Sequence, residues 1–312
     1  MDKVRVLIDT DLGDDVDDAA ALMLALSWGG IEIAGVTTVF KDTVKRAEMV
    51  EDLLELYGRE DIPVCAGYGG SIIERSFSGG EEPIQYGILK DKGKGCQGTG
   101  KADNDRTGRT EESKMVRADD FIIGKVKEDP GLVILAMGAM TNLAMAFLRE
   151  PEVMGRVKII GMGGSFMNSS PEWNIICDPE AASIVMEKSE NLIMMGLDVT
   201  KYLRIEEKRL TAWKAKGDIR LDYFLKGLKM FRDATGFPIT FHDVLLIAYL
   251  MDERVVSLKR GCFAVELSGK LTRGTMVDMT NYYEINPEVE HGFQFAGSVD
   301  LERFYRIVDE HF

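Results

Sequence analysis

The chain has 312 residues, of which 45% are hydrophobic, and carries a formal net charge of −14 with a sequence pI near 4.8. A chain of this length can bury a sizeable core in one large domain. Its acidic balance argues against nucleic acid or an anionic membrane as a partner, because phosphate groups are bound by clustered lysine and arginine.

Predicted strands and helices alternate along the first two thirds of the chain. Apolar runs typical of buried strands lie at residues 4–9, 31–40, 62–68, 131–138, 156–164 and 191–200. Helix-like stretches separate most of them, and this alternation predicts a parallel sheet with right-handed crossovers. A more helical region, a strand-like run and a closing helix follow at residues 206–253, 262–268 and 300–312. We predict an α/β fold in which residues 1–312 form a single domain, with a mostly parallel central sheet flanked by helices.

Residues 69–117 depart from this pattern. The segment includes "ILKDKGKGCQGTGKADNDRTGRT", which is rich in polar residues and glycine and has almost nothing to bury. Long loops of this kind are usually functional or disordered. Because the segment follows a predicted strand, and ligands of open α/β sheets bind at the carboxyl ends of strands, we predict an active-site loop here, with simple disorder as the alternative.

Cysteine usage and the N-terminus indicate the compartment. The four cysteines form no Cys-x-x-Cys pair and show neither disulfide nor zinc spacing. No apolar run approaches the roughly 18 residues of a membrane span. The N-terminus runs directly into a predicted strand without a recognisable signal peptide. We therefore expect a soluble, cytoplasmic protein.

Six aspartates fall within ten residues of the segment "VLIDTDLGDDVDDAAALMLAL", at the junction of the first predicted strand and helix. The helix dipole stabilises nearby carboxylates by only about 0.3–1 kcal/mol each. A bound divalent cation relieves their mutual repulsion better. With oxygen ligands alone, and no histidine or cysteine nearby, calcium or magnesium fits the segment and zinc does not. The simpler alternative is one helix-capping aspartate among solvated ones.

Two known metal motifs were weighed against this segment. An EF-hand loop needs glycine at its sixth position and glutamate at its twelfth, but counting from Asp9 these positions hold Asp14 and Ala20. The Asp-x-Asp of magnesium-dependent phosphatases of the haloacid dehalogenase type fits "LIDTDLG", with Asp9 as nucleophile. That motif gives no role to Asp17 or Asp18, so the phosphatase remains an alternative.

The segment "DTDLGDDVDDAAAL" resembles the N-terminal signature of the inosine-uridine-preferring nucleoside hydrolases, which are calcium-dependent nucleoside N-ribohydrolases. Further segments resemble this family in the family's own order along the chain: "GVTTVFKD", "DIPVCAG", "MGAMTNLAMAF", "VKIIGMGGSF", "EWNIICDPEAASIV", "FHDVLLIAYL" and "VDLERFYRIVDEHF". The resemblance implies a nucleoside hydrolase-like fold, a small nucleoside as substrate, and a homodimer or homotetramer.

This chain also departs from the family's common form. Two additional residues precede the paired aspartates, as in a divergent branch, so the pair aligns on Asp17 and Asp18, with Asp14 and Asp15 as possible substitutes. Lys41-Asp42 replaces a frequent Gly-Asn. The segment "GKGCQGTG" replaces a His-Gly loop, which leaves base recognition open.

The resemblance implies a calcium site and a general base. Calcium would be held by Asp11, Asp18, Asp243 and the backbone carbonyl of Thr141. Asp11 would also accept a proton from the attacking water, which requires a carboxylate within reach of the nucleophile. The pair "HD" at His242 and Asp243 would place a proton donor for the departing base beside a calcium ligand. A helix-borne histidine on its own is more often structural.

The remaining predicted residues concern the substrate. By resemblance, calcium would contact the ribose 2′- and 3′-hydroxyls. Asp17 and Asn174 would hydrogen-bond the ribose hydroxyls, and Glu172 and Asn168 would reach the 5′-hydroxyl. Asp42 would orient a neighbouring ligand, and Cys96 would contact or protonate the base. The expected activity is hydrolysis of the N-glycosidic bond of ribonucleosides to free base and ribose. The alternatives are the phosphatase and a ribose- or nucleoside-binding protein without catalytic activity.

Overall fold

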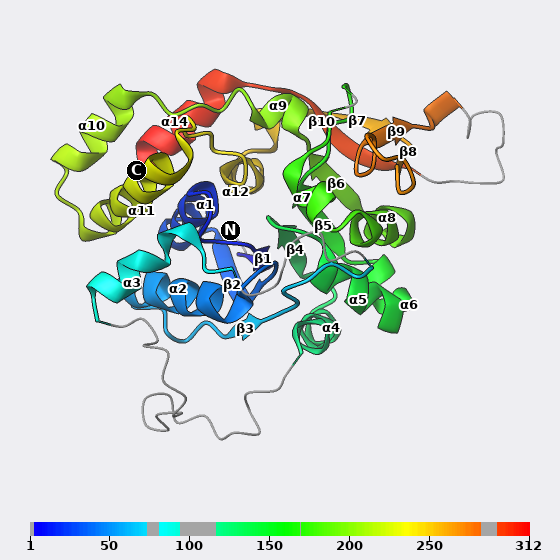
Figure 1. The fold of residues 1–312 in the computed structure, drawn as a ribbon, viewed down its shortest axis with the longest axis horizontal. Helices are drawn as coiled ribbons and strands as arrows, with labels where there is room; N and C mark the ends of the chain where they lie inside the picture. Colours follow the sequence, from blue (N-terminus) through cyan, green and yellow to red (C-terminus); the bar gives the residue numbers. More distant parts are fainter. Residues whose placement is uncertain (1–2, 74–80, 94–116, 169, 282–291) are drawn as a thin grey trace.

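A computed structural model describes residues 3–73, 81–93, 117–168, 170–281 and 292–312. In this part of the chain an eight-stranded sheet has the order β3-β2-β1-β4-β5-β6-β10-β7 (Figure 1). All neighbouring strands are parallel except β10 and β7. The strands are β1 (Val4–Thr10), β2 (Ile31–Thr38), β3 (Val64–Ala66), β4 (Val133–Ala136), β5 (Lys158–Met162), β6 (Leu192–Met195), β7 (Val256–Gly261) and β10 (Phe293–Val299).

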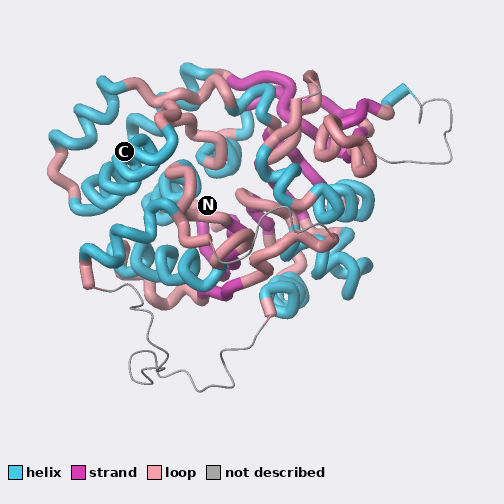
Figure 2. The backbone as a smooth tube through the Cα atoms, viewed as in Figure 1, coloured by secondary structure: helices cyan, strands magenta, loops and turns pink. Residues whose placement is uncertain are grey.

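Helices cover both faces of the sheet (Figures 1 and 2). Side chains of β1 alternate between the two resulting cores, with Val6 and Ile8 in one and Leu7 in the other, all with no exposed surface. The first core includes α1 (Asp17–Ser27), α2 (Thr43–Leu56), α10 (Glu207–Ala215), α11 (Ile219–Thr235), α12 (Val244–Met251) and α14 (Leu301–His311). The second core includes α4 (Ala118–Glu128), α5 (Thr141–Arg149), α6 (Pro151–Gly155) and α8 (Pro179–Lys188).

The predicted α/β fold with a mostly parallel sheet is confirmed, with two differences in the C-terminal region. The strand-like run at residues 262–268 forms β8 (Phe263–Val265), which pairs only with β9 (Met276–Asp278) in a separate two-stranded sheet. The strands β7, β9 and β10 were not predicted. Among the described residues, no helix is long and apolar enough to cross a membrane.

The predicted active-site loop at residues 69–117 is only partly described. Its described part contains the short helices η1 (Ile84–Tyr86) and α3 (Gly87–Asp91). Residues 74–80 and 94–116, which include Cys96, lie outside the described residues.

The loops after β1 and β4 meet at the carboxyl ends of the strands. The Met137 N–H donates to the Asp9 carbonyl at 2.7 Å, so the two chains stay paired as they leave the sheet. A β-carbon on Gly138 would lie 2.9 Å from Asp11 Oδ1. Glycine at this position therefore lets the β4–α5 loop approach the Asp11 side chain, and the edge of the sheet where ligands bind carries the acidic segment.

Candidate active site

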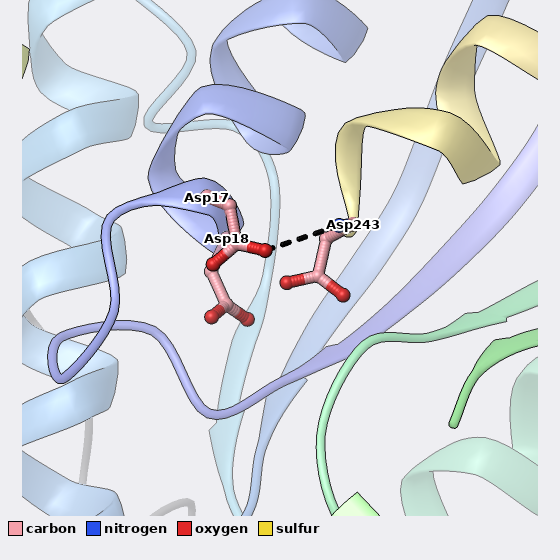
Figure 3. A group of neighbouring side chains, drawn as sticks. All are labelled: Asp17, Asp18 and Asp243. Atoms are coloured by element: carbon pink, nitrogen blue, oxygen red, sulfur yellow. Dashed lines mark hydrogen bonds between the residues drawn. The ribbon is translucent and has the colours of Figure 1, made fainter. Parts of the chain in front are cut away.

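Three buried carboxylates meet above this edge of the sheet. Asp17 and Asp18 begin α1, and Asp243 immediately precedes α12. Each offers one oxygen, and these atoms lie within 4.8 Å of one another (Figure 3). The three residues are only 3–4% exposed. Two segments more than 200 residues apart in sequence thus contribute to one acidic cluster.

Hydrogen bonds hold the cluster together without neutralising it. Asp17 Oδ2 accepts from the backbone N–H groups of His242 at 3.0 Å and Asp243 at 3.2 Å (Figure 3). Asp18 accepts from the Thr10 hydroxyl. Asp243 Oδ1 is buried and has no hydrogen-bond partner among the described residues. An unsatisfied buried oxygen is costly, so this atom is a candidate ligand.

Asp11 extends the cluster toward β4. It is 9% exposed. Burial raises the pKa of Asp11 to about 6; the Arg46 guanidinium opposes this rise, and the charges of Asp14 and Asp17 add to it. Burial, followed by charges that include that of Asp11, also raises the pKa values of Asp18 and Asp243 well above the ordinary range. Carboxyl groups in such a cluster cannot all ionise without a positive partner.

A hard divalent cation fits these residues. The donor atoms are oxygens, the site is buried, and Asp243 leaves one oxygen unsatisfied. Calcium and magnesium prefer such ligands. Thr141 is the first residue of α5 and follows the β4–α5 loop, in which Gly138 lies against Asp11. The Thr141 hydroxyl donates to Asp178 Oδ2 at 2.7 Å. That the Thr141 carbonyl binds the cation stays a prediction.

Two asparagine carboxamides of the predicted site are oriented by hydrogen bonds that their own amide nitrogens donate to the protein. Asn174 Nδ2 donates to the carbonyls of Met137 at 2.6 Å and Met162 at 3.2 Å, which tie α7 (Trp173–Cys177) to the ends of β4 and β5. Asn168 Nδ2 donates to Asp198 Oδ1 at 2.7 Å. Because Nδ2 faces the protein in both residues, the carbonyl oxygens are left to accept hydrogen bonds from a ligand.

Glu172 caps the N-terminus of α7. Its carboxylate accepts from the backbone N–H groups of Asn174 at 3.0 Å, Ile175 at 3.2 Å and Gly164 at 3.0 Å. Burial nevertheless raises the pKa of Glu172 to about 7. Glu172 therefore fastens the loop after β5 to α7, and whether it also contacts the 5′-hydroxyl stays a prediction.

His242 is oriented by α9 (Leu197–Thr200). Its Nδ1 lies 2.8 Å from Thr200 Oγ1, and its backbone N–H donates to Asp17. Burial lowers the pKa of the imidazole, against an opposing effect of the Asp17 charge. The contact with Thr200 fixes the ring plane, so Nε2 is the nitrogen left for a substrate.

The two additional aspartates have different surroundings. Asp14 Oδ2 pairs with Arg46 at 2.7 Å and Lys41 at 3.2 Å, and Oδ1 accepts from the Ile84 N–H at 3.3 Å. Burial alone would raise the pKa of Asp14, but Arg46 and Lys41 outweigh it and the pKa is lowered. Burial, and then the Asp17 charge, raises the pKa of Asp15 to about 8.

Comparison with known proteins decides the family. The family model for inosine-uridine preferring nucleoside hydrolases matches residues 6–306. The chain belongs to this family. It is 29% identical to an inosine-uridine preferring nucleoside hydrolase of Crithidia fasciculata, with 97% of this chain and 96% of the relative covered. It is 30% identical to uridine nucleosidase 1 of Arabidopsis thaliana, with 96% and 90% covered.

Solved structures of nucleoside hydrolases agree with this assignment. A purine-preferring ribonucleoside hydrolase from Gardnerella vaginalis matches with a TM-score of 0.79 and 26% identity, covering 98% of this chain and 97% of that chain. A plant nucleoside hydrolase matches with a TM-score of 0.79 and 25% identity, covering 99% and 98%. These matches support the nucleoside hydrolase interpretation over the phosphatase and the binding protein.

The pair aligned with the family signature is the pair that the structure brings together. Asp17 and Asp18 form the cluster with Asp243, whereas Asp14 is engaged by two cations. Asp42 caps α2, accepting from the Lys45 N–H at 3.1 Å, and its carboxylate lies 3.3 Å from Lys45 Nζ. Its predicted role in orienting a ligand remains a prediction, as does the role of Cys96, which lies outside the described residues.

Three supporting residues were not predicted: Arg46, Asp198 and Thr200. Each is buried and contacts a predicted site residue or its backbone. Their signal in the sequence is weak, because each contact joins segments at least 30 residues apart.

Replacing Asp14 with asparagine distinguishes the two aspartate pairs. Asp14→Asn removes the anion that faces buried Arg46, so we expect the free energy of unfolding to fall by about 2–3 kcal/mol, less than for a fully buried ion pair. Calcium binding should persist in Asp14→Asn and weaken in Asp18→Asn, because Asp18 is a predicted calcium ligand and Asp14 is not. Calorimetric titration with calcium measures the binding, and denaturant unfolding measures the stability. If calcium binding weakens in Asp14→Asn and persists in Asp18→Asn, Asp17 and Asp18 are not the pair that holds the cation.

Proposed function

We propose that this protein hydrolyses the N-glycosidic bond of ribonucleosides, releasing free base and ribose. The observation that carries the proposal is the cluster of Asp17, Asp18 and Asp243, whose oxygens lie within 4.8 Å of one another in a chain that belongs to the nucleoside hydrolase family. Water replaces the base at C1′, through a transition state with oxocarbenium character, as in glycoside hydrolysis.

Calcium is the proposed cofactor. Asp11, Asp18, Asp243 and the Thr141 carbonyl would hold it, and the buried, unpartnered Asp243 Oδ1 supports this assignment. When bound, calcium supplies positive charge that compensates the carboxylates, attracts ribose hydroxyls and favours ionisation of water.

The side chains divide the remaining work. Asp11 accepts the proton of the attacking water, a role suited to a carboxylate within hydrogen-bond reach of the nucleophile. Asp17 and the carbonyl oxygen of Asn174 bind ribose hydroxyls. His242, oriented through Nδ1 by Thr200, faces the departing base with Nε2. The bond electrons leave with the base nitrogen, which takes up a proton.

Acceptors in the proposed pocket match a sugar rich in hydroxyls. Asn168 and Asn174 both turn Nδ2 toward the protein, which leaves their carbonyl oxygens for the substrate. A site built to bind hydroxyls rejects analogues that lack them, because its own polar atoms are left unpaired. Asp42 and Cys96 remain candidates for contacts near the base. Base preference is left to experiment, because the relatives' names include both uridine and purine enzymes.

The phosphatase alternative requires Asp9 as a nucleophile. Asp9 has no exposed surface, its Oδ1 accepts from Thr37 at 2.5 Å and from Asn142 Nδ2 at 2.7 Å, and burial raises its pKa to about 7. A carboxyl group in this position is poorly placed to attack a phosphate. Asp9 instead connects the end of β1 to β2 through Thr37 and to the first turn of α5 through Asn142.

Release of free base tests the proposed activity. A panel of purine and pyrimidine ribonucleosides is incubated with calcium, after chelation, and with Asp11→Asn. We expect release that needs calcium and falls about 10²- to 10⁴-fold in the variant, the usual contribution of a general base. No release from any nucleoside, with calcium still bound, would instead support a binding protein.

Calcium binding is expected to strengthen as the pH rises from about 5 to 8. Asp11, with a pKa of about 6, and Asp18 and Asp243, with pKa values raised further, must lose protons before they bind the cation. Without calcium, the folded chain binds these protons more tightly than the unfolded chain does. Its free energy of unfolding therefore falls as the pH rises through this range. Calorimetry in buffers of different ionisation enthalpy measures the released protons; pH-independent binding contradicts the assignment.

The family resemblance further suggests cytoplasmic nucleoside salvage by a homodimer or homotetramer. Light scattering of the purified protein determines the assembly state. A monomer that retains activity would show that assembly is not required for the chemistry.

A further inference from the structure

Asp198, on the short helix α9, binds an entire loop of the proposed pocket. It is 4% exposed. Its Oδ1 accepts from the Ser165 hydroxyl at 3.1 Å and from Asn168 Nδ2 at 2.7 Å. Its Oδ2 accepts from the backbone N–H of Met167 at 3.1 Å and from that of Phe166. All four donors lie within residues 165–168, immediately after the loop glycines that follow β5.

These contacts determine the shape of the loop. Among the described residues, no lysine, arginine or histidine forms an ion pair with Asp198 within 4.0 Å. A buried carboxylate is costly unless hydrogen bonds satisfy it, so the loop must present its donors to this side chain. On the other side, Glu172 accepts from the Gly164 N–H at 3.0 Å. Two buried carboxylates therefore hold residues 164–168 from both ends.

The orientation of Asn168 follows from this arrangement. A carboxylate accepts only from the amide nitrogen, so Nδ2 must face Asp198 and Oδ1 must face away. Asn168 is exposed, in contrast to Asp198. An exposed asparagine would otherwise be free to rotate. The hydrogen bond to Asp198 holds the Asn168 carboxamide so that its carbonyl oxygen can accept a hydrogen bond from a ligand.

We propose that Asp198 is a positioning residue that fixes residues 165–168 and directs the Asn168 carbonyl oxygen at the 5′-hydroxyl of the nucleoside. The inference rests on the proposed nucleoside hydrolase function and on Asn168 as the residue that binds this hydroxyl. Asp198 itself touches neither the sugar nor the base. Its effect on catalysis passes through Asn168, and it should vanish for a substrate without a 5′-hydroxyl.

The test compares a cleaved nucleoside with its 5′-deoxy analogue. In Asp198→Asn, one side of the new amide remains an acceptor for the backbone N–H groups of Phe166 and Met167, and the other side becomes an NH2 group that opposes the Asn168 amide nitrogen. We expect kcat/KM for the nucleoside to fall about 10- to 100-fold, the usual effect of removing a residue that orients a ligand-binding group. For the 5′-deoxy analogue kcat/KM should change little. Asn168→Ala should show the same selectivity, and the double variant should be no worse than Asn168→Ala.

A second variant keeps the test decisive if Asp198→Asn does not fold. Asn168→Asp keeps an acceptor on the exposed loop but places a carboxylate against Asp198, so the hydrogen bond between them is lost. We expect the same selective loss for the 5′-hydroxyl substrate. Asp119→Asn is the matched control, because Asp119 is a fully buried carboxylate on α4 that pairs with Arg117, the residue before α4, and with Arg149 on α5. It should lower stability without changing the ratio of the two substrates.

Different failures are distinguishable. An equal loss for both substrates in Asp198→Asn, or additive effects of Asp198→Asn and Asn168→Ala, would reduce Asp198 to a purely structural residue. Unchanged selectivity in Asn168→Asp would overturn the proposal as well. If the variants give one of these results and the unaltered protein cleaves nucleosides, only the inference about Asp198 fails. If it cleaves none, the proposed function fails first and this inference with it.

Discussion

Replacing Asp18 with asparagine is expected to remove calcium-dependent activity and to stabilise the calcium-free protein. Asp18 is 4% exposed, and burial together with the charges of Asp11 and Asp17 raises its pKa well above the ordinary range. Asparagine keeps the shape of the side chain and an oxygen that can accept from the Thr10 hydroxyl, but it removes one anion from the cluster. The calcium-free form should therefore gain about 1–2 kcal/mol, as other substitutions that relieve strained functional sites do.

The same substitution should weaken calcium binding by more than about 100-fold, the upper limit for residues that only support a ligand. Thermal unfolding near pH 8, with chelator and with calcium, measures both effects. In the unaltered protein calcium should raise the unfolding temperature, because a ligand that binds only the folded chain stabilises it. In Asp18→Asn that increase should be lost.

Asp222→Asn serves as the control for this experiment. Asp222 is exposed in the first turn of α11, so its replacement should cost no more than about 0.3–1 kcal/mol through the helix dipole and should leave the response to calcium unchanged. An Asp18→Asn protein that is less stable without calcium, or that calcium still stabilises, would show that the cluster is not the cation site.

The parallel core of the fold could be predicted because its strands are buried on both faces. β4 reads as an uninterrupted apolar run, and the apolar run of β1 is broken only by Arg5 before it reaches Asp9; helices separate both strands from their neighbours. β10 escaped prediction because its sequence "FQFAGSV" mixes exposed and buried positions and begins directly after Gly292. Its antiparallel partner β7 is an edge strand in which Lys259 and Arg260 are exposed. Partially buried strands carry a weaker hydrophobic pattern.

The acidic part of the site could also be predicted, because the crowded aspartates of α1 and the His-Asp pair before α12 stand out in the sequence. Residues that hold these groups in place could not. Arg46 lies next to Lys45 in a helix whose later turns carry acidic residues, a charged pattern typical of a solvated surface, yet it has no exposed surface. Asp198 and Thr200 contact Asn168 and His242, which lie 30 and 42 residues away in sequence. Only the tertiary structure distinguishes such side chains from ordinary polar ones.

Arg46→Lys is expected to impair the enzyme by disturbing the Asp11 loop while keeping the positive charge. The Arg46 guanidinium donates through Nε to the Phe40 carbonyl at 2.8 Å and through Nη2 to Asp14 Oδ2 at 2.7 Å. Its Nη1 donates to the Leu12 carbonyl at 2.9 Å and also to the Asp11 carbonyl. Phe40 and Lys41 have positive φ angles of 68° and 58°, an unfavourable backbone conformation for residues other than glycine. Arg46 therefore stabilises a strained turn and the loop after β1 together.

A lysine ammonium cannot reproduce this planar set of donors, so several buried carbonyls would lose their partner. We expect the free energy of unfolding to fall by about 2–6 kcal/mol, from two unsatisfied buried acceptors at about 1–3 kcal/mol each. Turnover should fall at least tenfold, because the Asp11 backbone is no longer held. Saturating calcium should recover part of the stability, since it binds only the folded site, at about 2.7 kcal/mol for a hundredfold excess over Kd.

Arg149→Lys is the matched control, since Arg149 also pairs with a buried carboxylate, that of Asp119, but is 40% exposed and lies away from Asp11. It should cost less stability and leave turnover unchanged. Equal losses of turnover in the two variants would mean that general destabilisation explains the effect. A loss confined to Arg46→Lys, persisting at calcium concentrations that restore stability, would mean that catalysis depends on how this buried arginine shapes the loop that carries Asp11.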